Sequence, residues 1–312
     1  MPNSSRLIGA IVLGLGTVGL ATCTPTSNTA VSAPTTSSET DIATDLDRMA
    51  DQFLSVQELV PFLHDLTEDE AYRWQAEFVA ALQPSLGRIA GYKTGGHDTG
   101  PPNPNFPPHG IRGVLLEGMV HPSGASVTPN DAVWGFLEAD FAVRVGDESI
   151  NTAETDLQLL ASLDAVIPFI EIPDPAFRDN QRSPTGSIVT NMASRYAFVG
   201  EPILIEPTVA WINVLNTMTF AVHDEHGTEV GSGTLDGHYR PLTVVRWLRD
   251  HLRASGRRLE AGHLLSLGTI GINRQLKPGS PQGGPAYGGN QYRLSYYGLS
   301  GDASTVVVNI ER

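Results

Sequence analysis

The sequence has little cysteine, few basic residues and no long apolar run. Cys23 is the only cysteine among 312 residues, which excludes an internal disulfide framework and a zinc site built from several cysteines. Twenty basic side chains stand against 34 acidic ones, giving a formal net charge of −14. We therefore expect no nucleic-acid partner, because phosphate binding needs clustered Lys and Arg. No uncharged apolar run reaches the roughly 18 residues of a membrane-spanning helix.

The N-terminal residues 1–22 have the pattern of a secretory signal peptide. One basic residue, Arg6, precedes the uncharged apolar stretch 7–21, which is too short for a stable membrane anchor. Cys23 follows Leu-Ala-Thr, which resembles the cleavage signal of bacterial lipoproteins and makes Cys23 a candidate lipidation site. Ordinary signal-peptidase cleavage with an incidental Cys23, and a true start further downstream, stay open as alternatives. We expect an exported protein, either periplasmic or anchored to the membrane as a lipoprotein.

Residues 23–41 are predicted to form a flexible linker. Ten of the seventeen residues from 24 to 40 are Ser or Thr, and none is aromatic. Such a segment buries too little apolar surface to offset the entropy of ordering it. The folded part is then predicted to be a single domain over 42–312, with an N-terminal helical part to about residue 92.

Helical spacing and capping signals predict several helices in this folded part. Apolar residues predict a helix over 42–64, and the capping-box sequence from Thr67 to Glu70 opens a second helix. A further helix is predicted around 152–164, and another begins with Pro241 at its first position.

Strands are predicted between and after these helices. Runs rich in β-branched and aromatic residues lie at 136–145, 166–172, 216–223, 263–268 and 305–310. Two Gly/Pro-rich stretches, 94–113 and 276–291, are long enough to be lids or binding loops. This order of elements predicts an α+β fold.

Three carboxylates on the predicted strands are the most informative polar residues. Glu138 and Asp140 are two residues apart, so their side chains point to the same face of a strand. Two acids this close repel each other unless one is protonated or a cation lies between them. Glu171 lies among apolar neighbours, where it needs a partner. Together the three would suit Mg²⁺ or Mn²⁺. The spacing leaves open that Glu138 and Asp140 face solvent and that Glu171 only ends a strand.

Motifs along nearly the whole folded part carry a family resemblance. They are TEDEAYRWQ at 67–75, GYK at 91–93, FLEADFAV at 136–143, FIEIPD at 169–174, HGTEVGSG at 226–233 and the stretch from PLTVVRWLRDHL to LGT at 241–269. In this order and spacing they resemble the fumarylacetoacetate hydrolase superfamily, in particular its 2-keto-4-pentenoate hydratase branch. The resemblance implies a mixed β-sheet roll around a central cavity, with flanking helices, in homo-oligomers.

The resemblance also implies site residues. It implies Glu138, Asp140 and Glu171 as metal ligands and Lys93 as the acid/base group. Asp140 stands where the branch usually has Glu, one methylene longer. Three departures lie near the substrate in such enzymes: TGGHDTG follows GYK in place of a Gly-Leu-Thr type run, PDPAFRD replaces Asp-Ser-Arg, and Leu-Gly-Thr at 267–269 replaces Thr-Gly-Ser. Because of these departures, the resemblance supports the fold and the metal site more strongly than it supports a particular substrate.

We therefore expect a divalent-metal-dependent lyase, a hydratase of aromatic catabolism. It would act on a 2-oxo acid or a 2-hydroxy-dienoate through an enolate stabilised by the metal. A carbon–carbon bond hydrolase of acylpyruvates in the same superfamily is one alternative. An exported, catalytically silent protein that binds a small molecule is another.

Four further residues have both a functional and an ordinary interpretation. Lys93 is predicted to exchange protons, although most lysines are exposed on the surface. His97 is a candidate base or water-positioning group, as in the hydrolase branch, or part of a polar loop. Asn191 and Thr269 are predicted to bind substrate, although buried caps and turn contacts are equally natural for them. The His-Asp-Glu-His tract at 223–226 is interpreted as a solvated turn.

Overall fold

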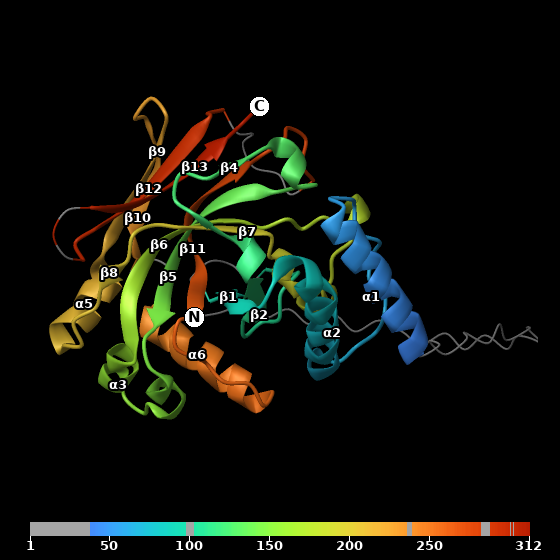
Figure 1. Ribbon diagram of the computed structural model, residues 1–312, viewed down its shortest axis with the longest axis horizontal. Helices are drawn as coiled ribbons and strands as arrows, with labels where there is room; N and C mark the ends of the chain where they lie inside the picture. The colour runs from blue at the N-terminus through green and yellow to red at the C-terminus, as the bar shows by residue number, and fades with distance from the viewer. Residues whose placement is uncertain (1–37, 98–102, 236–238, 282–287, 300, 302) are drawn as a thin grey trace, which may run out of the picture. The chain divides into compact units, whose positions relative to one another are not determined.

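The computed structural model of the chain describes residues 38–97, 103–235, 239–281, 288–299, 301 and 303–312 (Figure 1). The predicted signal peptide, Cys23 and the predicted linker before residue 38 lie outside these residues, so those assignments stay predictions. Among the described residues, no helix has both the length and the apolar character that a bilayer crossing requires.

The first helix, α1 (Glu39–Leu54), begins earlier and ends earlier than the sequence predicts. Its N-cap is Ser38, whose side chain takes part in a capping box, so the helix starts inside the segment predicted as a linker. The predicted helical end at residue 64 is wrong. Val56 has a φ of +54°, in the left-handed region that a β-branched residue rarely adopts. Residues 57–67, up to the start of the next helix, form no helix.

The second helix, α2 (Glu68–Leu86), confirms the predicted capping box at Thr67. Its apolar stripe is buried, as predicted, at Ala71, Trp74, Phe78 and Leu82. Gln75 lies on the same buried side, and its Nε2 donates to the carbonyl oxygens of Arg112 (2.9 Å) and Ile188 (2.8 Å). The helix is therefore fixed to the sheet by polar as well as apolar contacts.

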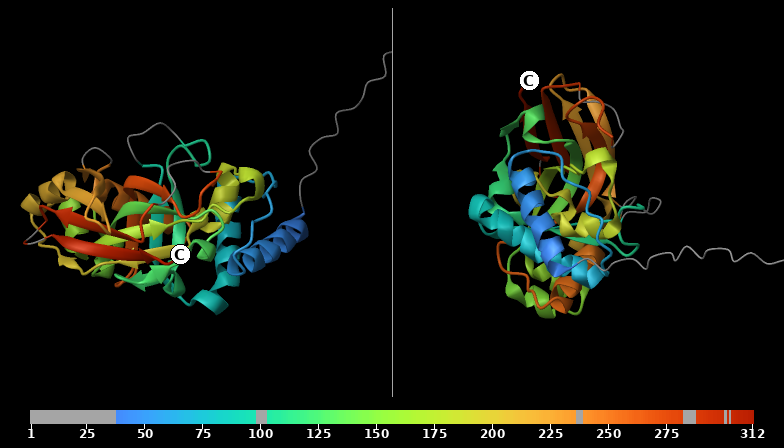
Figure 2. Two further views of the ribbon diagram at one scale, coloured as in Figure 1. Left: turned by 90° about the horizontal axis from the view of Figure 1, so that it is seen from above. Right: turned by 90° about the vertical axis from the view of Figure 1, so that its right-hand side faces the viewer.

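Two sheets form the body of the structure (Figures 1 and 2). The larger has the order β2-β1-β11-β5-β6-β7-β3, with β8 also paired to β6. The smaller has the order β10-β9-β12-β13-β4. Their strands are β1 (Ile89–Gly95), β2 (Ile111–Leu116), β3 (Val120–Pro122), β4 (Ser126–Val127), β5 (Phe136–Val145), β6 (Leu163–Ile172), β7 (Tyr196–Val199), β8 (Ile203–Leu204), β9 (Thr219–Asp224), β10 (Glu229–Thr234), β11 (Leu264–Gln275), β12 (Gln291–Tyr297) and β13 (Ser304–Ile310).

The predicted strands are confirmed, with corrected ends. The strand 136–145 is found unchanged as β5. The strand predicted at 263–268 continues to Gln275 as β11, because irregularities in its pairing with β5 let the two strands stay paired past Gly268. The expected α+β fold with a mixed, curled sheet and outer helices is confirmed: β1 pairs with β11 and β3 pairs with β7 in parallel, and the other pairs of this sheet are antiparallel.

The remaining helices lie around the sheets (Figures 1 and 2). They are α3 (Asp156–Ala161), α4 (Pro184–Val189), α5 (Val209–Thr217) and α6 (Pro241–Ala254), with 3₁₀ turns η1 (Glu117–Met119), η2 (Pro129–Asp131), η3 (Glu148–Thr152), η4 (Arg178–Asn180) and η5 (Asn191–Ala193). The helix predicted over 152–164 is therefore too long, because Thr155 caps it and β6 begins at Leu163. The predicted start of α6 at Pro241 is confirmed.

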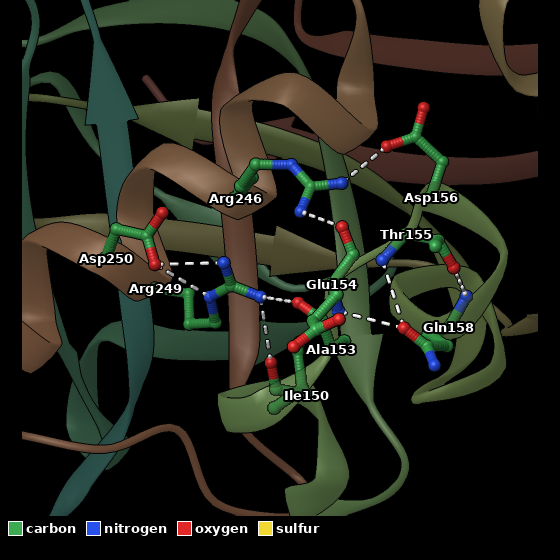
Figure 3. A network of polar contacts seen from close by, with 9 residues as sticks. All are labelled: Ile150, Ala153, Glu154, Thr155, Asp156, Gln158, Arg246, Arg249 and Asp250. Carbon is green, nitrogen blue, oxygen red and sulfur yellow. Dashed lines mark hydrogen bonds and ion pairs between the residues drawn. The ribbon is translucent and has the colours of Figure 1, made fainter.

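Two arginines fasten α6 to the η3–α3 segment (Figure 3). Buried Arg249 donates from Nη1 to the carbonyl oxygens of Ile150 and Ala153. Arg246 pairs with Asp156 (2.7 Å) and donates to the carbonyl oxygen of Glu154. These bonds satisfy carbonyl groups at the end of a short turn, and they hold α6 in place.

Gly91 shows why the Gly-Tyr-Lys motif needs glycine. On β1 it pairs with Leu264 of β11, and a Cβ added to Gly91 would lie 1.9 Å from the Leu264 carbonyl oxygen. This neighbour is backbone, which cannot turn aside as a side chain can. The close approach of these strands sets the position of Lys93, two residues further along β1.

We predict that Gly91→Ala lowers the free energy of unfolding by about 2 kcal/mol or more, because the methyl group must push β1 away from β11. Chemical denaturation of both proteins measures this loss. Gly288→Ala is the control, since a Cβ at Gly288 has no atom of the other described residues within 4 Å beyond its chain neighbours. An equal effect of the two substitutions would contradict the explanation.

Candidate metal centre and its cavity

The structure brings together the three predicted carboxylates. Glu138 of β5 lies directly opposite Glu171 of β6 in the strand pairing, and Asp140 is two residues from Glu138 on the same face. One carboxylate oxygen of each lies within 4.8 Å of those of the other two. The solvent-facing alternative is wrong for Asp140, which is 1% exposed, whereas Glu138 is partly exposed. Glu171 does lie near the end of β6, but its side chain is buried among these acids. The three residues could therefore hold one divalent cation.

The proximity of these acids changes their titration. Burial, together with the Glu171 carboxylate, raises the pKa of Glu138 from 4.5 to about 8. Burial, Glu171 and Glu138 raise the pKa of Asp140 well above its ordinary value. Removal of these acids from water and their mutual repulsion both disfavour the charged form.

The hydrogen bonds of Asp140 leave one of its carboxylate oxygens for a cation. Its Oδ2 accepts from Ser266 Oγ at 2.5 Å. Its Oδ1 is buried and has no hydrogen-bond partner among the described residues. A buried carboxylate oxygen of this kind costs free energy unless something binds it. A Mg²⁺ or Mn²⁺ ion, which prefers carboxylate oxygens, fits this set of donors.

Lys93 reaches the carboxylates from another strand. Its side chain is 2% exposed and its Nζ donates to Glu171 Oε1, so the interpretation as a surface lysine is wrong. β1 and β6 are three positions apart in the sheet, about 14 Å if the sheet were flat. Lys93 and Glu171 can meet only because the sheet curls and turns both side chains inward.

A cavity of about 710 Å³ opens beside this cluster. Glu138, Glu171 and Lys93 line it together, whereas Asp140 is not among its lining residues. Aromatic rings form much of the remaining lining, at Phe53, Phe106, Phe136 and Phe177. Its volume suits a small organic molecule. Phe106 belongs to the Gly/Pro-rich stretch 94–113, part of which lies outside the described residues.

The structure places the other predicted site residues in different settings. His97 lines the cavity, and its ring lies 4.4 Å from the ring of Trp247 on α6. Thr269 also lines the cavity, while its Oγ1 donates to the Ala139 carbonyl oxygen at 3.1 Å. Both can therefore contact a bound molecule.

Asn191 is outside the cavity lining and has a structural contact. It is 1% exposed, and its φ of +56° lies in the left-handed region. Its Oδ1 accepts from the Val114 amide at 2.6 Å, and its Nδ2 donates to the Val114 carbonyl oxygen at 2.8 Å. Both ends of the side-chain amide thus bind the backbone of β2.

Two tyrosines near the carboxylates were missed by the sequence analysis. Tyr296 Oη donates to the Asp140 carbonyl oxygen, and Tyr239 Oη donates to the Gly268 carbonyl oxygen at 3.0 Å. Burial and the nearby Asp140 raise the pKa of both hydroxyls well above the ordinary value, so both stay neutral donors. No local motif marks either position, because the fold brings Tyr239, just before α6, and Tyr296 of β12 to Asp140 from far along the chain.

The turn predicted for the His-Asp-Glu-His tract is confirmed for its second half: His223 and Asp224 end β9, and Glu225 and His226 form the turn to β10. Asp224 Oδ1 accepts from the amides of His226 (2.9 Å) and Thr228 (2.8 Å). These bonds lower the pKa of Asp224, although burial opposes them. The carboxylate oxygen is occupied by the turn itself.

We predict that Mg²⁺ raises the melting temperature more at pH 8 than at pH 5.5. Without metal, folded Glu138 holds a proton up to about pH 8, whereas unfolded Glu138 releases it near pH 4.5. This difference makes the metal-free fold less stable as the pH rises between those values. Mg²⁺ binds the ionised carboxylate of Glu138, so it binds more tightly at pH 8 than at pH 5.5. Its binding therefore offsets the stability that the metal-free fold loses as the pH rises.

Differential scanning calorimetry with and without Mg²⁺, at equal ionic strength, measures both effects. Glu138→Gln is the matched control, since it keeps the side-chain shape and removes the titrating group. An equal Mg²⁺ shift at both pH values in the unsubstituted protein would contradict the metal site.

Comparison with known proteins places the fold. The chain is similar to 4-oxalocrotonate decarboxylase from Pseudomonas putida G7 complexed with magnesium and adipate, with a TM-score of 0.69 and 18% identity over 88% of this chain and 99% of that chain. The same decarboxylase complexed with calcium and acetate gives 0.68 and 19% over the same shares. A fumarylacetoacetate hydrolase family protein from yeast gives 0.51 and 11%, over 71% and 92%.

No protein-family model matches the sequence, and a search of curated proteins finds no match. Identities below 20% show the fold alone. The chain therefore shares the fold of these proteins, one of which is of the fumarylacetoacetate hydrolase family, and the fold that the motifs led us to expect is confirmed.

Proposed function

We propose that the chain is a divalent-metal-dependent lyase that acts on a 2-oxo acid. The observation that carries this proposal is the convergence of Glu138, Asp140 and Glu171 within 4.8 Å, with buried Lys93 in contact with Glu171 at the edge of a cavity. The magnesium complex of the decarboxylase with the same fold supports it. A 2-oxo acid fits, because its carboxylate and 2-oxo oxygens can bind one cation together.

A bound divalent cation would polarise these two oxygens and stabilise the negative charge of an enolate. The chain's own residues would hold the ligand and move the proton. Glu138, Asp140 and Glu171 would hold the cation and so set where the 2-oxo acid binds. Lys93 Nζ lies at the same carboxylates, within reach of a proton on the bound acid or its enol.

The neighbouring residues would assist in different ways. His97, packed on Trp247 at the cavity wall, would position or activate water. Thr269 Oγ1 donates to Ala139, and its lone pairs can accept a hydrogen bond from the ligand. Asn191 would act through Val114 of β2, the strand beside Lys93's own strand, rather than by touching the ligand.

Hydration of a 2-hydroxy-dienoate is the first reaction that we propose. Decarboxylation is a second candidate, favoured by the fold shared with 4-oxalocrotonate decarboxylase. Both reactions pass through an enolate next to the metal ligands, and both need one group that moves a proton. Cleavage of a carbon–carbon bond in an acylpyruvate would instead need water delivered to the ligand by His97.

Three assays on the Mg²⁺-loaded protein separate these reactions. Loss of the ultraviolet absorbance of a 2-hydroxy-dienoate without CO₂ release supports hydration. Release of CO₂ from a 2-oxo-enedioate supports decarboxylation, and release of pyruvate from an acylpyruvate supports hydrolysis. Binding of all three compounds without turnover would support a catalytically silent binding protein and contradict the proposed lyase activity.

We predict that Lys93→Ala lowers kcat on the order of a hundredfold or more, because no other group replaces the proton transfer. Mg²⁺ affinity should be kept or increased, since the metal ligands stay and a cation beside Glu171 is removed. Lys277→Ala is the control, because Lys277 donates to the Ala132 carbonyl oxygen away from the carboxylates. If calorimetry shows that Lys93→Ala binds Mg²⁺ and its turnover is unchanged, Lys93 is not the group that transfers the proton.

A further inference from the structure

A left-handed turn of three residues borders the cavity. Asn191, Met192 and Ala193, which form η5, have φ values of +56°, +52° and +56°. None of them is glycine, and in this region the Cβ of an L-residue lies too close to the backbone, which costs free energy at each position. Such strain persists only where the surrounding structure holds it.

Hydrogen bonds from other segments hold this turn. Both ends of the Asn191 side-chain amide bind the backbone of Val114 on β2. The Asn191 carbonyl oxygen accepts from the amide (3.0 Å) and from the Oγ (2.8 Å) of Ser194. The Ala193 carbonyl oxygen accepts from the Asp174 amide at 2.8 Å. The residue between Asn191 and Ala193 is therefore fixed from both sides.

Met192 is the long side chain that η5 brings to the cavity. Met192 and Ala193 line the cavity, and the Met192 side chain is partly buried against the core. Its methyl carbon Cε lies over Gly95 of β1, because a Cβ added to Gly95 would be 2.3 Å from this atom and 3.5 Å from the Phe106 ring. Gly95 thus leaves the space that the Met192 methyl group occupies.

This methyl group lies along β1 from the catalytic lysine of the proposed function. Lys93 and Gly95 are two residues apart, so both face the same side of the strand, and two residues of a strand span about 7 Å. Lys93 Nζ contacts Glu171, and Lys93, Glu171 and Met192 line the same cavity. A ligand chain that starts at the carboxylates and follows β1 therefore meets Met192.

We propose that Met192 sets how long an apolar chain the cavity accepts. The 2-oxo acid end of the ligand lies at Glu138, Asp140 and Glu171, and its chain runs along β1 to the Met192 methyl group. The strain of η5 is then what it costs to hold a flexible, apolar side chain at this point of the wall. This inference rests on the proposed function for the 2-oxo acid end and adds the residue that determines chain length.

A series of straight-chain 2-oxo monocarboxylates, from 2-oxobutanoate to 2-oxooctanoate, tests it by binding alone. Calorimetric titration of the Mg²⁺-loaded protein gives the length limit, the longest chain that still binds more tightly than the next shorter one. Met192→Ala should move this limit to a longer chain by at least one carbon. Each methylene that becomes buried should tighten binding about threefold to fourfold, and the affinity for 2-oxobutanoate should stay within about twofold.

Gly95→Ala should act in the opposite direction, and it tests the proposal independently of Met192→Ala. The added Cβ forces the Met192 Cε to move, and the cavity is the open space beside it. The length limit should therefore move to a shorter chain. Gly95→Ala should also lower the melting temperature less in the Met192→Ala protein than in the unsubstituted one, because the contact is then absent.

Met192→Leu is the matched control, because leucine nearly conserves the volume of methionine. It should keep the length limit of the unsubstituted protein. A merely structural role of Met192 would instead weaken every acid of the series alike, with no change in the limit.

The outcomes separate this inference from the proposed function. An unchanged limit in Met192→Ala or in Gly95→Ala, or affinity that still rises at 2-oxooctanoate in the unsubstituted protein, overturns the role of Met192 and leaves the 2-oxo acid site intact. An equal loss of melting temperature on Gly95→Ala in both proteins contradicts the contact and overturns it too. Failure of every 2-oxo acid to bind the Mg²⁺-loaded protein overturns the proposed function and this inference with it.

Discussion

Repulsion between three carboxylates is the interaction on which the rest of the site depends. The pairing of β5 with β6 sets Glu138 opposite Glu171, and the two-residue repeat of a strand adds Asp140 to the same face. Burial then strengthens the repulsion, because water no longer screens it. The fold tolerates this only with protons or a cation on the acids, so the cluster is better explained by binding than by stability.

Residues of neighbouring strands hold these three carboxylates in position. The curled sheet brings Lys93 from β1 to Glu171, and the glycine at 91 lets β1 lie close enough to β11 for that reach. Tyr296 and Ser266 bind the main chain and the side chain of Asp140. These contacts join strands of both sheets, so the geometry of the site depends on the way the two sheets pack together.

Local patterns predicted the parts of the structure that local forces decide. The β-branched and aromatic run at 136–145 and the Thr67 capping box can be recognised from neighbouring residues alone, and both are confirmed. The end of α1 could not be predicted, because the chain after Val56 pairs with the distant segment at 176–178. Asn191 is a second example of a residue whose partner lies far along the chain. An asparagine can bind a ligand, but the structure shows that both polar atoms of its side chain are hydrogen-bonded to the backbone of Val114. Tyr239 and Met192 carried no pattern at all.

The segment after Glu171 is where the chain departs most from the motifs it resembles. The related motif has Asp-Ser-Arg, and here Asp174 is followed by Pro175 and Ala176. Asp174 keeps a structural role, accepting from the Val133 and Trp134 amides. Ala176 lines the cavity without charge, whereas Arg182 supplies a guanidinium six residues later, from the other side of η4. The segment therefore leaves the three carboxylates together and changes the charge and shape of the cavity wall beside them.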